Sequence, residues 1–533
     1  MSGYAGTGTL VRLALRRDRV LIPVCLLGFI ALAGGSARST VALYPDPTQA
    51  VAAARAAALS PAIVGMYGPI AAPDNPDSIG AFKTLVLGGL FLAIFAFAIV
   101  RRHTRTEEDA GRTELVGAGV VGRRAPLTAA VLIAAATVLI TSLGSSLSMA
   151  GAGLGLAGSL AFGVAWAGIG LSFVGVTAVA AQLTETTRGC AAVALGTLGA
   201  TYLLRAVGDT TSGAGWLTWL SPIGWAEKVE VYGANRVLVF LLPLVVTVGL
   251  VAVAFALLQR RDLGSGLVAA RPGPATAAAS LRSPLALAWR LQRGLLVGWA
   301  IGFAVLGLVL GAVAGSVSAF VDSPEIADML AKLGGNAPSL GDTFISTELH
   351  FMAVAAAAYG ISAALRLTSE EADLHTEQVL ATPASRRAHL GAHAVIALGG
   401  SALLMLVMGT GVAVGAAGEY GGLGGALGHL LPAALAPVPA VWVCVGLALV
   451  VYGALPKVVV VAWALLAGFL AVGEFGPLFG LPTVVVDLSP FSHGAMVPGG
   501  AVPGAPLAAL ALLAAALVLA AGVTFRRRDL VSG

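Results

Sequence analysis

Apolar runs of about 20 residues recur along the whole chain, and polar segments rich in Arg, Pro and Gly separate them. As a helix, each run is long enough to cross a hydrocarbon core of roughly 30 Å. Segments such as Phe82–Val100 and Leu507–Phe525 are apolar on every face, whereas the strands of a transmembrane barrel alternate apolar and polar residues. The pattern therefore predicts an all-α integral membrane protein.

We expect about twelve spanning helices in two groups of six, with a polar stretch between the groups. The first group is placed at Val20–Ala37, Phe82–Val100, Pro126–Leu147, Leu156–Ala181, Cys190–Leu204 and Val237–Leu258. The second group is placed at Gly294–Val317, Thr343–Leu365, Leu390–Ala413, Ala433–Tyr452, Val458–Gly473 and Leu507–Phe525. The expected halves are residues 1–270 and 284–533, joined by a cytoplasmic linker at 271–283.

Composition and charge agree with a membrane protein. Hydrophobic residues make up 58% of the chain and charged residues only 11%, which excludes a water-soluble globular domain. With the N-terminus inside, most of the 31 basic residues fall in predicted cytoplasmic segments, so both termini are expected in the cytoplasm of a bacterial plasma membrane. The small excess of basic residues indicates no nucleic-acid partner.

The chain contains an internal duplication. Glu107–Glu114 reads E-E-D-A-G-R-T-E, and Glu370–Glu377 reads E-E-A-D-L-H-T-E, at an offset of 263 residues. The same offset carries the pair Arg123-Arg124 onto Arg386-Arg387. Further echoes follow in the same order: Ala14-x-Arg16-x-x-Arg19 with Ala288-x-Arg290-x-x-Arg293, Leu220-Ser221-Pro222 with Leu488-Ser489-Pro490, and Arg260-Arg261-Asp262-Leu263 with Arg527-Arg528-Asp529-Leu530. Equivalent motifs fall on the same side of the membrane, which predicts two parallel six-helix repeats.

The duplicated acidic segment lies in the cytoplasmic loop after the second span of each half. Thr104-x-x-Glu107 and Thr368-x-x-Glu371 fit a capping box, so each loop is expected to begin a short helix along the membrane face. One interpretation is a solvated charged helix held by neighbouring arginines. The other, which the duplication favours, is a docking element for a partner with two equivalent faces. The candidate docking residues are Glu107, Glu108, Arg112, Glu114, Glu370, Glu371, His375 and Glu377.

With these motifs, each half resembles the membrane subunit of an ATP-binding-cassette (ABC) exporter of the six-helix type. The fused arrangement is similar to the actinobacterial polyketide-antibiotic and multidrug exporters. The resemblance implies connecting helices at Leu10–Arg19 and Leu285–Arg293, and coupling helices at Glu107–Glu114 and Glu370–Glu377. It also implies outer re-entrant elements at Trp216–Trp225 and Asp487–Phe491.

The resemblance implies a transport subunit, and not an enzyme, that moves hydrophobic or amphiphilic compounds such as antibiotics out of the cell. The sequence has no G-x-x-x-x-G-K-[ST] motif and no soluble stretch large enough for a nucleotide-binding domain. ATP and Mg would therefore be bound by two copies of a separate ABC ATPase, and this chain would hold no cofactor.

A few polar groups lie in or near the apolar runs and are candidates for the substrate pathway, because charges at membrane depth are costly. They are Arg205, Glu348, His350 and Glu474. Each lies near a predicted helix end, where water can also solvate it. His389 and His393 are spaced for one helix face, but without a nearby Glu or Cys they predict no metal site.

Two other function classes stay open. A secondary transporter of the major facilitator type also has twelve helices in two parallel halves, but its loop after the second helix is usually short and carries a Gly-x-x-x-Asp-Arg-type pattern. An integral-membrane enzyme acting on lipids would need His, Asp or Glu clustered at one membrane face, and the sequence shows no such constellation.

Overall fold

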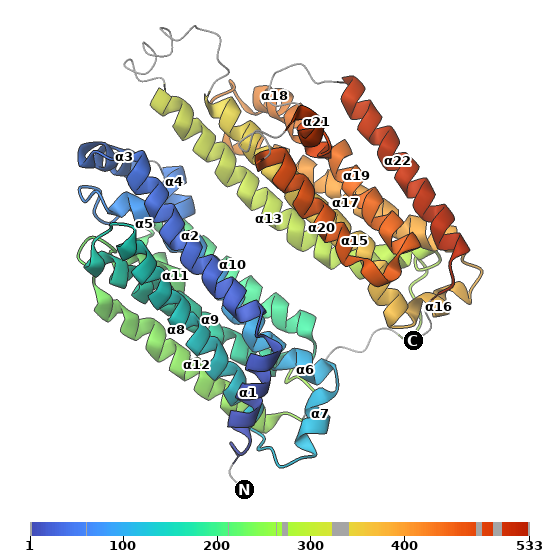
Figure 1. Cartoon of the computed structure of the whole chain (residues 1–533), viewed down its shortest axis with the longest axis horizontal. Helices are drawn as coiled ribbons and strands as arrows, with labels where there is room; N and C mark the ends of the chain where they lie inside the picture. The colour runs from blue at the N-terminus through green and yellow to red at the C-terminus, as the bar shows by residue number, and fades with distance from the viewer. Residues whose placement is uncertain are drawn as a thin grey trace. The chain divides into compact units, whose positions relative to one another are not determined.

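The computed structural model describes residues 3–59, 61–211, 213–262, 264–268, 275–321, 340–475, 482–493 and 504–530. These ranges are helical with short connections and contain no strand. The chain divides into two compact units, Met1–Gly273 and Pro274–Gly533 (Figure 1).

The first unit runs from α1 to α12. Its elements are α1 (Thr7–Arg17), α2 (Leu21–Leu43), α3 (Pro47–Leu59), α4 (Pro61–Tyr67), α5 (Ser78–Arg102), α6 (Arg105–Asp109), α7 (Arg112–Gly117), α8 (Ala125–Gly151), α9 (Leu156–Leu183), α10 (Thr187–Thr210), η1 (Gly215–Leu220), α11 (Pro222–Glu227), η2 (Val237–Phe240) and α12 (Leu241–Arg260). The helices α3 and α4 lie between the first two spans and were not expected from the hydropathy pattern.

The second unit runs from α13 to α22. Its elements are α13 (Pro284–Val321), α15 (Leu340–Ala372), α16 (His375–Leu380), α17 (Arg386–Gly415), α18 (Leu423–Leu435), α19 (Val438–Ala454), η3 (Pro456–Val458), α20 (Val460–Leu470), η4 (Ala471–Phe475), α21 (Thr483–Val486), η5 (Pro490–His493) and α22 (Gly504–Arg527).

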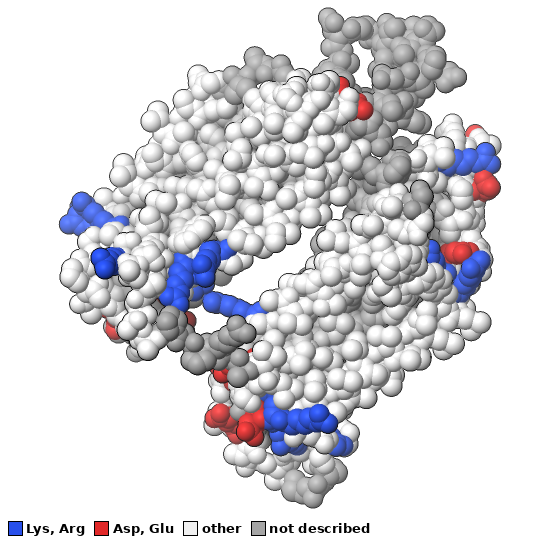
Figure 2. Space-filling model, turned by 180° about the vertical axis from the view of Figure 1, so that it is seen from behind, with Lys and Arg blue, Asp and Glu red and all other residues white. Residues whose placement is uncertain are grey.

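The all-α membrane fold is confirmed. In the described part of the chain, 11 helical segments are long and apolar enough to cross a membrane, and each overlaps one of the expected spans. The remaining expected span, Val458–Gly473, corresponds to a shorter apolar helix at Val460–Gly473. Large apolar side chains are exposed along these helices, for example Leu241 and Val248 on α12. Figure 2 shows that charged residues are clustered on the surface and that wide areas between the clusters carry no charge.

The same helix pairs pack together in both units, which agrees with the duplication. In the first unit α2 packs on α8, α5 on α9, and α9 on α12. In the second unit the corresponding pairs are α13 with α17, α15 with α19, and α19 with α22. The fourth span of each unit is thus its central helix. On α9, the buried Trp166 donates its indole N–H to the carbonyls of Thr84 and Leu85 on α5, at 3.3 and 3.1 Å.

The two expected connecting helices differ in form. α1 is a separate helix that ends before Asp18, and the Asp18 carboxylate lies 2.6 Å from His103 and 2.8 Å from Arg102 at the end of α5. In the second unit the expected connecting helix is simply the first part of the 38-residue α13. Gln292 takes the place of Asp18 in the repeat and, unlike aspartate, is a good helix former, so the helix continues.

Two G-x-x-x-G motifs bring α13 and α17 into backbone contact. A methyl group added at Gly307 or Gly311 would lie 2.6 Å from the Met408 carbonyl oxygen or 2.2 Å from that of Val412. From the other side, one added at Gly411 would lie 2.9 Å from the Ala304 carbonyl oxygen. In a membrane the hydrophobic effect does not drive helices together, because the lipid tails are as apolar as the side chains. Helices there commonly pack through small residues that let their backbones approach closely.

We expect Gly411→Val to destabilise the protein by about 1–3 kcal/mol, because the added side chain forces the two backbones apart. The matched control is Gly399→Val on the same helix, where an added methyl group meets nothing within 4 Å. Thermal unfolding of the purified variants in detergent measures both. Equal unfolding temperatures for the two variants would contradict the packing argument.

Candidate coupling site

The duplicated acidic loop forms a similar turn in both units. In the first unit α6 and α7 are separated by Gly111, whose φ is 67°. In the second unit α15 continues to Ala372, and α16 follows Leu374, whose φ is 60°. These two residues are equivalent in the duplicated motif. Both loops therefore reverse through one left-handed residue, a conformation that glycine adopts freely and leucine does not.

Both predicted capping boxes are wrong. Thr104 stands at the N-terminus of α6, but its hydroxyl donates to the Val100 carbonyl of the preceding turn, at 2.6 Å. Thr368 lies inside α15 and caps nothing, because the second span extends past the acidic pair. A threonine hydroxyl often donates to the backbone carbonyl four residues earlier, and it then does not cap the following helix.

The first unit holds Glu108 in a buried ion pair. Its carboxylate lies 2.6 Å from Arg261, just beyond the end of α12, and 2.7 Å from Arg105. Arg261 also donates to the side-chain oxygen of Gln182 on α9, at 2.8 Å. Arg105 donates to the carbonyl of Ala181, at 2.8 Å. These contacts tie α6 to the ends of α9 and α12.

The second unit repeats this pair with the equivalent residues. Glu371 lies 2.5 Å from Arg528, which follows α22 and matches Arg261 in the R-R-D-L echo. Tyr452, at the end of α19, donates its hydroxyl to Glu371 at 2.9 Å. We call the two pairs, Glu108–Arg261 and Glu371–Arg528, the carboxylate clamps. The first joins α6 to the residue after α12, and the second joins the end of α15 to the residue after α22.

The start of the third span braces each clamp. Arg123 donates to the carbonyl of Arg261, and Arg386 donates to the carbonyl of Arg528 at 2.6 Å. The basic pairs that the duplication singled out are therefore part of the clamps. A signal for the missed partners was present in the sequence, since the R-R-D-L echo contains both arginines.

The outer glutamates, Glu107 and Glu370, are also paired within the chain. Glu107 contacts Arg17 of α1 and lies 2.7 Å from Arg112 of α7. This hydrogen bond to Glu107 raises the pKa of Arg112. Glu370 lies 3.0 Å from Arg366 and 3.5 Å from His375, the counterpart of Arg112. The link across the left-handed turn is thus kept in both units.

Glu114 and Glu377 are placed differently. They lie on α7 and α16, and both side chains are exposed. The candidate docking residues therefore form two groups. Glu107, Glu108, Glu370 and Glu371 make the ion pairs described above, and Glu114 and Glu377 are the exposed glutamates of the set.

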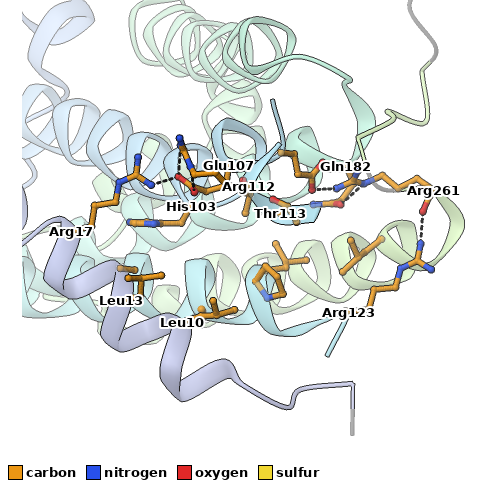
Figure 3. A pocket seen from close by; sticks show the side chains of 17 residues that line it. Leu10, Leu13, Arg17, His103, Glu107, Arg112, Thr113, Arg123, Gln182 and Arg261 are labelled. Carbon is orange, nitrogen blue, oxygen red and sulfur yellow. Dashed lines mark hydrogen bonds and ion pairs between the residues drawn. The ribbon is translucent and has the colours of Figure 1, made fainter. Parts of the chain in front are cut away.

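A cavity of about 380 Å³ lies beside the clamp of the first unit (Figure 3). Its walls come from α1, α6 and α7, from the residues just after α5, and from the loop-side ends of α8, α9 and α12. In Figure 3, Leu10 and Leu13 of α1 lie across the cavity from Glu107 and Arg112. Further lining residues include Arg17, His103, Arg123, Leu127, Gln182, Leu258 and Arg261.

Of the candidate pathway residues, Arg205 is fully buried and is engaged by the protein itself. It donates to the carbonyls of Gly65 and Met66 at the end of α4, at 2.7 and 2.9 Å, and lies 3.1 Å from the Glu227 carboxylate. Asp209 is 3.6 Å away. These contacts fasten α4 to α10 and α11.

The other candidates belong to the second unit. Glu348 and His350 lie on α15 and are half-buried, and His350 packs edge-on against Phe491 of η5. Glu474 lies in η4, and its side chain is outside the described residues. His389 and His393 lie 5.2 Å apart between ring centroids on α17, and His393 is 2.9 Å from Gln292.

This chain resembles a known protein family. The family described as the C-terminal domain of the multidrug efflux system permease Rv1217c matches residues 281–526. The multidrug efflux system permease protein Rv1217c of Mycobacterium tuberculosis is 38% identical over 534 residues, which cover 99% of this chain and 96% of the relative.

We expect Glu371→Leu to destabilise the protein by about 3 kcal/mol or more, because it leaves Arg528 as an uncompensated, partly buried cation. Adding Arg528→Leu should restore much of that loss, since the unpaired charge is then gone. Thermal unfolding of both single variants and the double variant gives the coupling. Additive effects would show that the clamp does not act as a pair.

Proposed function

The chain belongs to the multidrug efflux permease family represented by Rv1217c, and on that basis we propose that it is the permease subunit of an ATP-driven exporter. It is a multi-pass protein of the plasma membrane, and its resemblance to ABC-type permeases is confirmed at the level of the family. In our proposal, two copies of a separate ABC ATPase bind ATP and Mg and drive transport.

The observation that carries this proposal is the pair of carboxylate clamps. A partner that moves α7 or α16 also moves α6 or the end of α15, because these segments adjoin in the chain. Glu108 and Glu371 then transmit the displacement to Arg261 and Arg528, beside the ends of α12 and α22. The clamps thus provide a rigid connection between an external face and the spanning helices.

We infer that the ATPases dock at the exposed glutamates, with Glu114 on α7 and Glu377 on α16 as equivalent contacts. The two docking faces differ, because α7 also exposes Leu115, where the repeat places Gln378 on α16. Glu108 and Glu371 link the docking helices to the spanning helices and do not contact the ATPase themselves. Binding and hydrolysis of ATP would alternately favour two states of the permease, each with its own contacts.

The proposed cargo is a hydrophobic or amphiphilic compound that leaves the cell. The related permease from Mycobacterium tuberculosis is named for multidrug efflux. Glu348 and His350 stay candidates for the pathway, whereas the contacts of Arg205 favour a structural role for it.

The docking proposal predicts that Glu114→Arg combined with Glu377→Arg abolishes co-purification with the partner ATPase, because both contacts change sign. Stimulation of ATP hydrolysis by the permease should be lost in the same variant. The measurement is affinity purification from co-expressing cells, followed by an ATPase assay with and without the permease.

The matched control is Asp262→Arg combined with Asp529→Arg. These aspartates are also duplicated and exposed, and they follow the clamp arginines, outside α7 and α16. The control should keep the complex and the stimulation. If the Glu114/Glu377 variant also kept both, the docking assignment would be wrong.

ATP-driven export predicts that inside-out vesicles take up ethidium only when they contain the permease, the ATPase and ATP. Dissipating the proton gradient with an ionophore should leave uptake unchanged while ATP is supplied. Fluorescence of the dye in the vesicle lumen reports uptake. Uptake by the permease alone, driven by a proton gradient, would instead support the secondary-transporter alternative.

A further inference from the structure

The cavity beside the first clamp sits where the second unit carries larger side chains. Leu258 of α12 corresponds to Phe525 of α22 in the segment before the R-R-D-L echo, and Pro126 corresponds to His389 at the offset of 263. Gln182, which accepts from Arg261, has its functional counterpart in Tyr452, which contacts the Arg528 clamp. Each substitution adds side-chain volume in the second unit.

Those larger side chains are buried in the second unit. Tyr452 and Phe525 are fully buried, and His389 is 4% exposed. The rings of Tyr452 and Phe525 pack with their centroids 5.5 Å apart and their planes tilted by 34°. The Arg528 guanidinium lies over both rings, 4.9 and 5.2 Å from their centroids. The first unit therefore has an opening beside Arg261, whereas aromatic rings pack beside Arg528 in the second.

The opening is basic at one part of its wall and apolar at another. Four arginines line it against two glutamates: Arg17, Arg112, Arg123 and Arg261 against Glu107 and Glu108. Leu10, Leu13, Leu127 and Leu258 supply apolar wall. In the second unit the counterpart of Arg17 is Leu291 and that of Arg112 is His375, so much of the positive charge is also specific to the first unit.

The guanidinium groups have capacity for a further acceptor. Each arginine carries five N–H donors. Among the described residues, the hydrogen bonds found use one donor of Arg17, two of Arg112 and one of Arg123. A phosphate or carboxylate can accept from the remaining donors in the charge-assisted geometry that arginine favours.

We propose that this cavity binds an anionic amphiphile, with its head group at Arg17, Arg112 and Arg123 and its alkyl chain along the leucines. The volume of about 380 Å³ lies in the lower part of the range of about 300–1,000 Å³ for small-molecule sites. It suits a head group with part of one chain. The proposed docking contact Glu114 does not line the cavity, although Arg112 and Thr113 of the same helix do.

Two sources share this chemistry, an acidic membrane phospholipid and a single-chain anionic compound. The purified permease in dodecyl maltoside is incubated with phosphatidylglycerol or with phosphatidylcholine of the same chains, and native mass spectrometry records the bound lipid. In a second arm, dansyl-undecanoic acid is titrated and its fluorescence is followed. Preference for phosphatidylglycerol identifies a lipid site, and binding of the dansyl acid alone identifies a single-chain site.

The variant Gln182→Tyr with Leu258→Phe copies the second unit into the first and should abolish anion binding by filling the cavity. Arg17→Leu, also copied from the repeat, removes a cation without filling the cavity. It should weaken anion binding about tenfold, as expected for loss of one charge-assisted contact. Leu241→Phe is the matched control, because it makes the same substitution as Leu258→Phe at an exposed position of α12.

Thermal unfolding verifies that each variant is folded. If the filled variant, Gln182→Tyr with Leu258→Phe, does not fold, the Arg17→Leu result decides the test. Equal binding of phosphatidylglycerol and phosphatidylcholine, with no binding of the dansyl acid, would overturn the proposal. So would unchanged anion binding in both the Arg17→Leu variant and a folded filled variant. Neither outcome affects the docking proposal, which is measured by complex formation.

Discussion

The buried pair of a glutamate and an arginine is the contact on which the candidate site depends. Taking two charges out of water is costly, and their attraction offsets that cost only when the geometry is good and further hydrogen bonds are made. Glu108 and Glu371 meet these conditions, since each has a second polar partner, Arg105 or Tyr452. Separating the two partners leaves a charge without compensation, which is costly. The segments that carry them are therefore expected to move together.

The duplication preserved these pairs while their neighbours diverged. Arg261 is supported by the amide of Gln182, whereas Arg528 lies over the ring of Tyr452. The left-handed turn uses Gly111 in one unit and Leu374 in the other. The rings of Tyr452 and Phe525 pack beside Arg528 in the second unit, and a cavity lies beside Arg261 in the first. The two clamps thus have different surroundings.

A single residue early in the chain contributes to this difference. The carboxylate of Asp18 meets Arg102 and His103, and the helix breaks there. α1 then lies against α8 as a separate wall, with its leucines towards the cavity (Figure 3). In the second unit Gln292 continues the helix and binds His393 instead.

The sequence by itself determined the spanning helices, the duplication and the location of the acidic loops, because hydropathy and internal repeats are properties of the chain read in order. It did not predict α3 and α4, and it was wrong about the roles of Thr104 and Thr368. It could not separate the inward Glu108 from the outward Glu114, although they stand six positions apart. That distinction depends on Arg261, 153 residues away in the chain, and only tertiary packing decides which carboxylate such a distant arginine meets.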